Sequence, residues 1–249
     1  MRRALVIVGK PPEPGLAKTR LVPPLTAADA AALYRGFLLD GVGLGRGLGW
    51  ERVTVVHPED GGPALAALLP PTVCLLEQRG QGLSNALAQA FATHLAEGFD
   101  RVVLIGSDNP TLPPALIEQA CAALDTHDVS IGPSTDGGYY LIGLREPHLE
   151  LFQAVDWSTS RVFRQTLAHA ERLGLRVRSV AEWYDVDEPP DLERLYHDLA
   201  TSPTSVAPNT RAALELLSEP ARHLYSGDYS GDVGSGGTSS AGVRPDSSA

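Results

Sequence analysis

The sequence has few of the residues that mark disulfide-rich, zinc-binding or membrane-spanning proteins. Only two cysteines occur among its 249 residues, Cys74 and Cys121, and neither belongs to a CxxC or Cys/His cluster. Neither a disulfide framework nor a zinc site is therefore indicated, and we expect both cysteines in the core as small side chains. No apolar run approaches a membrane span, and the N-terminal run is too short for a signal peptide. We expect a soluble, cytoplasmic protein.

Positive charge is also scarce. Acidic residues outnumber Lys plus Arg by 30 to 20, which gives a formal net charge of -10 at pH 7. This balance argues against proteins that bind nucleic acids or anionic membranes nonspecifically. Only two of the basic residues are lysines, Lys10 and Lys18, and both lie in one Pro/Gly-rich stretch. A compact point charge suits that stretch if it binds phosphate, and chance placement in an Arg-biased sequence is the alternative.

Strand-like apolar runs alternate with segments of helical period along most of the chain. This alternation predicts a single α/β domain over residues 1–200, with a Rossmann-like, mixed but mainly parallel sheet and helices on both faces. A linker and helix follow over 201–225, with Asn209 as the helix cap, and the Gly/Ser-rich residues 226–249 are expected to be disordered. The expected strands are 4–8, 52–57, 73–77, 101–106, 129–132, 139–143 and 176–180, and the expected helices are 26–42, 64–69, 83–97, 115–124, 161–173, one beginning near 188, and 210–217.

The loop after the first strand, GKPPEPGLAKTRL, is the first candidate site. Its glycines, Gly15 among them, permit unusual backbone angles, and Lys18, Thr19 and Arg20 place two charges and a hydroxyl just before a helix. Such a loop suits phosphate oxygens, although it is neither a Walker A loop nor a GxGxxG fingerprint. An ordinary basic connecting loop is the alternative.

Two acidic segments are candidates for a divalent metal. Asp108 follows the best strand of the sequence, at the sheet edge where parallel sheets bind their ligands. Asp185 and Asp187 alternate along a second segment, so only one of them is expected to face the cleft. The alternatives are an Asx-turn at Asp108 before Pro110, and a helix N-terminus after Asp187.

A third candidate combines a carboxylate, glycines and aromatic side chains, as sites for sugars or similar polyols do. A Gly-Gly turn entering a strand explains the same residues. The histidines do not cluster, and no Ser-His-Asp order is visible, so hydrolase and zinc-enzyme interpretations are disfavoured. The residues of this candidate are Asp136, Gly137, Gly138 and Tyr139, with Trp157, Ser158 and Thr159 downstream.

Taken in order, the motifs KxPxPGxxKTRL, VLIGSDxPxL, DGGYYLIGL, WST and YDVDxPxDL resemble a bacterial family of the nucleotide-diphospho-sugar transferase superfamily. The resemblance runs from about residue 3 to about residue 217. Members of this family are described as glycosyltransferase-A-like, in some cases as glycosyltransferases of arsenosugar biosynthesis. The resemblance implies a glycosyltransferase-A fold and glycosyl transfer from a nucleoside-diphosphate sugar to a small acceptor, with no nucleic-acid or membrane partner.

The same resemblance implies roles for single residues. Asp108 and Asp187 would bind Mg2+ or Mn2+, and Lys18 and Arg20, with Lys10 nearby, would hold the nucleotide phosphates. Lys18 and Asp108 would act in catalysis by neutralising charge on the phosphate leaving group. The residues 136–139 and 157–159 would line the acceptor or sugar side.

One segment departs from the family pattern. Residues 82–87, GLSNAL, are instead similar to the GLNxAL segment of phospholactate guanylyltransferases, which also have an AKTRL-like loop. Gly82 and Asn85 would then contact the nucleotide. This similarity implies a nucleotidylyltransferase that joins an NTP to a phosphorylated small molecule and releases pyrophosphate. A noncatalytic nucleotide-binding module is a third interpretation, which the two candidate metal carboxylates disfavour.

Overall fold

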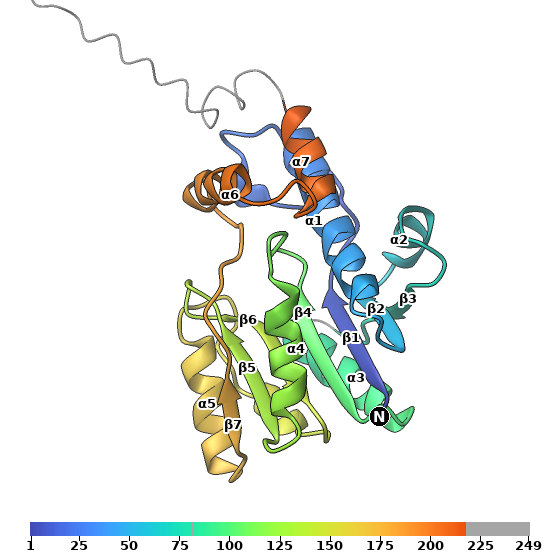
Figure 1. The fold of residues 1–249 in the computed structure, drawn as a ribbon, viewed down its shortest axis with the longest axis vertical. Coiled ribbons are helices and arrows are strands. Elements are labelled where there is room, and N and C mark those ends of the chain that lie inside the picture. The colour runs from blue at the N-terminus through green and yellow to red at the C-terminus, as the bar shows by residue number, and fades with distance from the viewer. Residues whose placement is uncertain (81, 218–249) are drawn as a thin grey trace, which may run out of the picture.

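The computed structural model describes residues 1–80 and 82–217, and the predicted tail at 226–249 lies outside them (Figure 1). Every predicted strand and helix in the described part is present, with ends that differ by a few residues. In chain order the elements are β1 (Arg3–Val8), α1 (Ala27–Gly47), β2 (Arg52–His57), α2 (Gly62–Leu68), β3 (Cys74–Glu77), α3 (Leu83–Ala96), β4 (Arg101–Gly106), α4 (Pro114–Ala123), β5 (Val129–Pro133), β6 (Tyr139–Leu144), α5 (Val162–Arg172), β7 (Val177–Ser179), α6 (Pro189–Thr201) and α7 (Pro208–Glu215), with 3-10 turns at Thr19–Leu21 and Leu149–Phe152.

The strands form one mixed sheet of seven strands in the described residues, in the order β3-β2-β1-β4-β6-β5-β7. Strands β1, β2, β3 and β4 pair in parallel, and β6 runs antiparallel to both β4 and β5. The predicted mixed, mainly parallel sheet is therefore confirmed. Strand β6 follows β5 through the short, turn-rich PSTDGG segment. It runs antiparallel to β5 because so short a connection can only reverse the direction of the chain.

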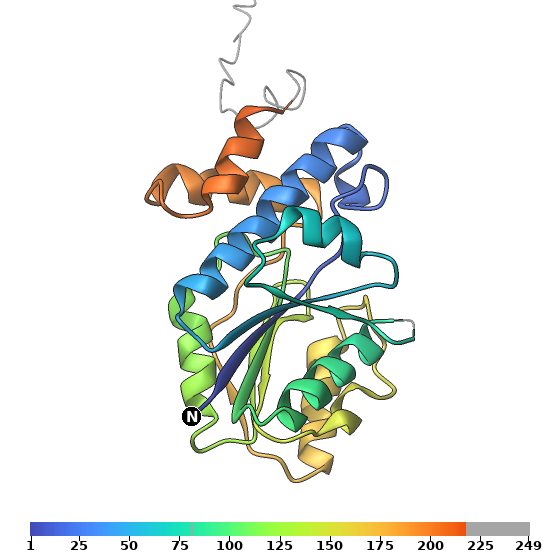
Figure 2. The same ribbon diagram turned by 90° about the vertical axis from the view of Figure 1, so that its right-hand side faces the viewer.

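Helices cover both faces of the sheet, as Figure 2 shows from the side. Along β1, Leu5 and Ile7 enter one apolar cluster, whereas Ala4 and Val6 enter another on the opposite face. This alternation follows from the two-residue period of a strand, and both faces are apolar because both are buried. The first cluster includes residues of α1, α2 and α4, and the second includes residues of α3 and α5.

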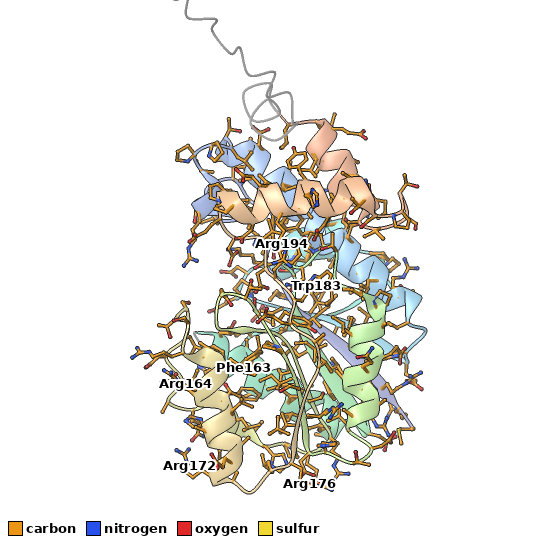
Figure 3. The ribbon with its side chains drawn as sticks, turned by 60° about the vertical axis from the view of Figure 1, so that its left-hand side comes forward. Phe163, Arg164, Arg172, Arg176, Trp183 and Arg194 are labelled. Carbon is orange, nitrogen blue, oxygen red and sulfur yellow. The ribbon has the colours of Figure 1, made fainter. Side chains whose placement is uncertain are left out.

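A third apolar cluster joins α1, α6 and α7 beyond the end of the sheet (Figure 1). The chain reaches this layer through Trp183 and Tyr184, and Figure 3 places Trp183 and Arg194 where the layer meets the sheet. The Arg194 guanidinium carbon lies 3.8 Å from the centre of the Tyr184 ring. This layer lies at the edge of the sheet formed by the carboxyl ends of β1 and β4, where the loops that follow these strands begin. It therefore closes one side of that edge.

The helix cap predicted at Asn209 is wrong. Helix α7 begins at Pro208, with Ala207 as its cap residue, because proline suits the first helical position. Asn209 lies inside the first turn, where its backbone and side-chain N–H groups donate to Asp40 Oδ1 at 3.0 and 2.8 Å. Thr210 N donates to Asp40 Oδ2 at 2.7 Å. The cap of α7 therefore comes from α1, far away in the sequence.

The core position predicted for both cysteines is confirmed only for Cys121. Cys74 is exposed, because it begins β3 at the open edge of the sheet. Within the described part of the chain, no helix combines the length and apolar character that crossing a membrane requires.

Candidate functional site

A large cleft of about 1100 Å³ opens at the carboxyl ends of β1 and β4, the place where open α/β sheets bind ligands. The loop between β1 and α1, the turn after β4 and the segment before α6 form its walls. The predicted site residues that line it are Lys10, Lys18, Thr19, Arg20, Gly82, Asp108, Asp136, Gly138, Tyr139, Trp157, Ser158, Thr159 and Asp187.

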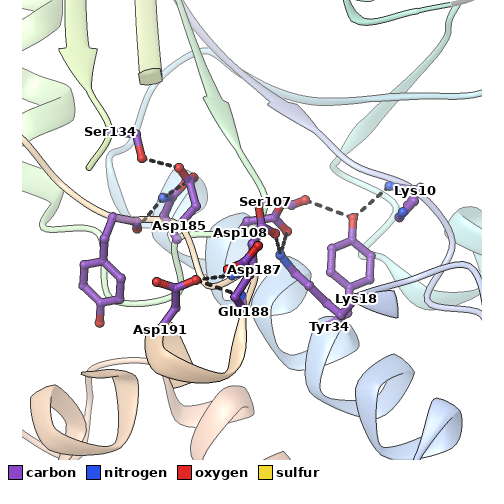
Figure 4. Close-up of polar contacts among 12 residues, drawn as sticks. Lys10, Lys18, Tyr34, Ser107, Asp108, Ser134, Asp185, Asp187, Glu188 and Asp191 are labelled. Atoms are coloured by element: carbon purple, nitrogen blue, oxygen red, sulfur yellow. Dashed lines mark hydrogen bonds and ion pairs between the residues drawn. The ribbon is translucent and has the colours of Figure 1, made fainter. Parts of the chain in front are cut away.

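Lys18 lies at the centre of the charged part of this cleft (Figure 4). Its Nζ is 2.7 Å from Asp108 Oδ1 and 2.7 Å from Asp187 Oδ1, and its side chain is only 4% exposed. Burial by itself lowers the pKa of Lys18, but the two carboxylates outweigh burial and raise it, so the ammonium stays charged. The sequence thus places its rare lysine between the two carboxylates that were predicted to bind metal.

The two carboxylates come from segments far apart in the chain, which backbone hydrogen bonds hold side by side. Val186 N donates to the carbonyl of Asp108 at 2.9 Å and docks the second segment onto the turn after β4. Asp191, in the first turn of α6, accepts hydrogen bonds through Oδ2 from the backbone N–H groups of Asp187 and Glu188 at 3.1 and 2.8 Å. The helix cap of α6 therefore also fixes the backbone at Asp187.

The expectation that only one of Asp185 and Asp187 faces the cleft is wrong, because both line it. Residues two apart in an extended segment lie on the same side, and the burial alternates accordingly: Tyr184 and Val186 are buried, whereas Asp185 and Asp187 are partly exposed. Asp185 accepts hydrogen bonds from Ser134 Oγ and from Asn109 Nδ2, the latter at 2.7 Å. Burial raises the pKa of the Asp185 carboxyl to about 6, despite these two hydrogen bonds. Asp185 was visible in the sequence as a candidate, but its partners were not.

A hydrogen-bonded tyrosine, Tyr34, lies at the floor of the cleft, and no sequence motif pointed to it. The Tyr34 hydroxyl accepts from Lys10 N at 3.0 Å and lies 2.9 Å from Ser107 Oγ. Burial raises its pKa to about 12, so it remains a neutral phenol. Tyr34 comes from the Ala-rich helix α1 and ties that helix to the loops after β1 and β4.

The opposite wall carries the predicted acceptor side. Asp136 Oδ1 accepts from Gly138 N at 2.8 Å, and the Tyr139 and Trp157 rings meet edge to face at 6.2 Å. Ser158 has a left-handed backbone, with φ of 61°, which turns the 157–159 loop toward the cleft. This wall combines a carboxylate, hydroxyls and aromatic faces, the mixture that polyol ligands use.

Three predicted residues lie outside the lining. Gly15 forms a turn with φ of +79°, and Gly137, with φ of +87°, packs so closely on Ser160 that a side chain would collide with the backbone there. The Asn85 side chain lies against Gly80, at the loop before α3. These residues shape the loops around the cleft.

The charged part of the cleft fits a divalent cation. Two carboxylate oxygens converge on one position, which the Lys18 ammonium now takes. Among the described residues, no group of three or more His, Cys, Asp or Glu side chains could enclose a metal ion. Two carboxylates with substrate phosphates and water are the usual shell of Mg2+, so this donor set suits a cation that arrives with a phosphorylated ligand.

The chain is similar to known proteins in sequence and in fold. A family model described as uncharacterized protein conserved in bacteria (DUF2064) matches residues 44–159. A 2-phospho-L-lactate guanylyltransferase from Methanothermobacter thermautotrophicus is 31% identical over 137 residues, which cover 54% of this chain and 59% of that protein.

Two solved structures are similar over most of the chain. A protein from Desulfovibrio desulfuricans G20, provisionally named a nucleotide-diphospho-sugar transferase, has a TM-score of 0.79 and 31% identity, covering 90% of this chain and 98% of that one. A nucleotidyl transferase from Methanothermobacter has a TM-score of 0.53 and 18% identity, covering 81% and 99%, and this likeness concerns the fold alone.

Proposed function

Because the chain belongs to the nucleotide-diphospho-sugar transferase family, sharing 31% identity over 98% of the Desulfovibrio relative, we propose that it transfers a glycosyl group from a nucleoside-diphosphate sugar to a small acceptor, with Mg2+ or Mn2+. The observation that carries the proposal is the convergence of Asp108, Asp187 and Lys18 at the carboxyl edge of the sheet. A metal–diphosphate complex needs both signs of charge at one point, and this site provides them.

In this mechanism the cleft divides into a phosphate side and a sugar side. Lys18, with Arg20 and Lys10 on the same loop, neutralises the diphosphate as it leaves. Asp108 and Asp187 would hold the divalent cation, which would supply further neutralisation of that leaving group. Asp136 and the Tyr139–Trp157 wall orient the sugar and the acceptor across the cleft, so no covalent enzyme intermediate is required.

A second candidate, nucleotidylyl transfer from an NTP to a phosphorylated acceptor with release of pyrophosphate, has its own support. The curated relative that is named a guanylyltransferase supports it, although the alignment covers only 59% of that protein. The position of Lys18 beside both carboxylates also suits it, because an attacked α-phosphate would lie where the metal and the ammonium meet.

One assay separates the two reactions. The protein is incubated with a panel of nucleoside-diphosphate sugars or NTPs, Mn2+ and a mixture of small bacterial metabolites, and phosphorus NMR follows the products. Release of a nucleoside diphosphate from one sugar donor supports glycosyl transfer, and release of pyrophosphate from one NTP supports nucleotidylyl transfer. Absence of both products with every donor, in a folded protein, rejects the proposal.

A further inference from the structure

The Lys18 ammonium takes the position that a metal ion would be expected to take. Its Nζ bridges Asp108 Oδ1 and Asp187 Oδ1 at 2.7 Å each, as Figure 4 shows. The carboxylates are 34% and 39% exposed to the cleft, whereas the lysine side chain is 4% exposed. The lysine is therefore buried more deeply than the pair, although it also lines the cleft, and the carboxylates keep exposed surface.

The backbone holds Lys18 in this place. Lys18 adopts a left-handed conformation, with φ of 50°, between the fully buried side chains of Ala17 and Leu21. Its Nζ also lies 5.7 Å from the centre of the Phe37 ring on α1. The ammonium is largely screened from bulk water but still lines the cleft, and its position follows from the loop and not from a flexible surface side chain.

The charges at this point decide which ligand the site accepts. The two carboxylates carry two negative charges and Lys18 returns one positive charge, so the cluster holds one net negative charge. A bare divalent cation would meet an ammonium a few ångströms away, and the repulsion is strong where little water screens it. Nucleotide phosphates remove that repulsion, because they offer the ammonium new anionic partners while they ligate the cation.

We propose that Lys18 is the built-in counter-ion of the Asp108–Asp187 pair, and that this cleft takes a divalent cation only as part of a metal–nucleotide complex. The inference rests on the proposed function for the presence of a nucleotide, but its central consequence concerns the metal alone. Removal of the Lys18 charge should open the pair to the free cation. Lys18 thus selects the metal–nucleotide complex over the free divalent cation.

Lys10 provides a matched control. It is the other lysine of the chain, lies on the same loop and lines the same cleft. Its Nζ donates to the carbonyl of Leu16 at 2.6 Å. Lys10→Met and Lys18→Met change the net charge equally, so a difference between them reports on position and not on the total charge.

The test measures binding of Mn2+ alone, and of Mn2+ with a nucleoside diphosphate, from the paramagnetic resonance signal of free Mn2+. We expect Lys18→Met to bind Mn2+ alone about tenfold more tightly than the wild type, and Lys10→Met to stay within about twofold of it. In the wild type the nucleoside diphosphate should tighten Mn2+ binding by about tenfold or more, and in Lys18→Met it should do so much less.

Three results would overturn the proposal: equal Mn2+ affinities of the wild type and Lys18→Met, tight binding of Mn2+ by the wild type without nucleotide, or no Mn2+ binding by any variant. If Lys18→Met does not fold, Lys18→Gln replaces it, and the wild-type titration still decides by itself. Turnover is measured separately with the wild type. Metal-dependent turnover with equal affinities would reject this inference and leave the proposed function standing.

Discussion

Asp108 is the residue on which the proposed chemistry depends most directly. Asp108→Asn keeps the shape of the side chain but removes the charge that a cation needs, so we expect turnover to fall by about 100-fold or more. The thermal midpoint should change by only a few degrees, since the side chain is one-third exposed. Enzyme assays and thermal unfolding measure the two effects. Glu193→Gln, on an exposed position of α6, is the control for both.

Full activity in Asp108→Asn would contradict the metal assignment. A loss of activity accompanied by a large fall in the thermal midpoint would instead show that the carboxylate stabilises the fold. The comparison is informative because Lys18 retains Asp187 as a partner in this variant, so the ammonium is not left unpaired in the protein.

At the scale of single residues, the charged residues of the site could be predicted from the sequence more readily than the contacts between side chains. Lys18, Asp108 and Asp187 stood out by residue type, motif and position after a strand. Tyr34 did not, because an apolar stripe with one hydroxyl is typical of an ordinary core helix. Its bond to Ser107 Oγ joins residues 73 positions apart, and only the packing of α1 on the sheet creates it.

At the scale of elements, Asp40 joins α1 to α7. Its carboxylate accepts three N–H groups from the first turn of α7, and Gly36 on α1 has no room for a side chain against Thr210. Asp40→Ala removes this cap, and we expect it to lower the free energy of unfolding by about 1–2 kcal/mol, as loss of a helix cap does. Denaturant unfolding measures the change.

Limited proteolysis locates the effect of Asp40→Ala. Cleavage should become faster near α7 before it does so in the sheet, because the lost hydrogen bonds belong to that helix alone. Glu193→Ala on α6 should leave both measurements unchanged. Uniformly faster cleavage throughout the chain would show that Asp40 supports α1 itself and not the contact between the two helices.

Asp128 joins the strands at the opposite end of the sheet. It precedes β5 and accepts hydrogen bonds from Arg176, before β7, and from Arg145, after β6, at 2.8 to 3.1 Å. The Arg176 side chain, its backbone N–H and Arg145 hold the pKa of Asp128 well below its usual range. A lowered pKa stabilises the fold above the unfolded pKa near 4, and this contribution is lost as the pH falls below it.

We therefore expect Asp128→Asn to lower the thermal midpoint at pH 7 by about 2–4 °C, which corresponds to about 1 kcal/mol. The difference from the wild type should shrink below about pH 4, because both proteins then approach a neutral side chain. Thermal unfolding from pH 2 to pH 8 measures it. A difference that stays constant over that range would mean that shape, and not charge, accounts for the effect.

The elements show where local pattern suffices and where it does not. Most helix and strand ends fell within a few residues of their predicted positions, because apolar periodicity and breaker residues are local signals. The predicted cap at Asn209 is wrong, because Pro208 occupies the first helical position and the side chain that accepts the N–H groups of α7, Asp40, belongs to α1. A helix cap that comes from a distant part of the chain cannot be predicted from the residues around the helix end.

At the scale of the whole molecule, alternating strands and helices predicted the sheet class but not the order of its strands. Insertion of β6 between β4 and β5 depends on long-range pairing, such as Val103 with Gly143, which no local pattern encodes. The edge that carries the cleft was predictable even so. Parallel strands bring their following loops to one edge whatever their order, and the pairing of β1 with β4 then places Lys18 beside Asp108.

This common edge makes one last prediction about the whole molecule. Under the proposed function a nucleotide with its metal would bridge the β1–α1 loop, the turn after β4 and the segment before α6, so its binding should stabilise all three against unfolding together. At a concentration 100 times the Kd the gain is about 2.7 kcal/mol, or roughly 5–10 °C in the thermal midpoint. Thermal unfolding with NTPs, nucleoside diphosphates and nucleoside-diphosphate sugars, with and without Mg2+ or Mn2+, measures it.

The pattern of shifts identifies the donor. A shift given by one nucleoside-diphosphate sugar and metal together favours glycosyl transfer, and a shift given by one NTP and metal favours nucleotidylyl transfer. Metal alone should shift the wild type little, because Lys18 already neutralises much of the carboxylate pair. Equal shifts with and without metal would contradict the role of Asp108 and Asp187, since a nucleotide that needs no cation would be held by the basic loop alone.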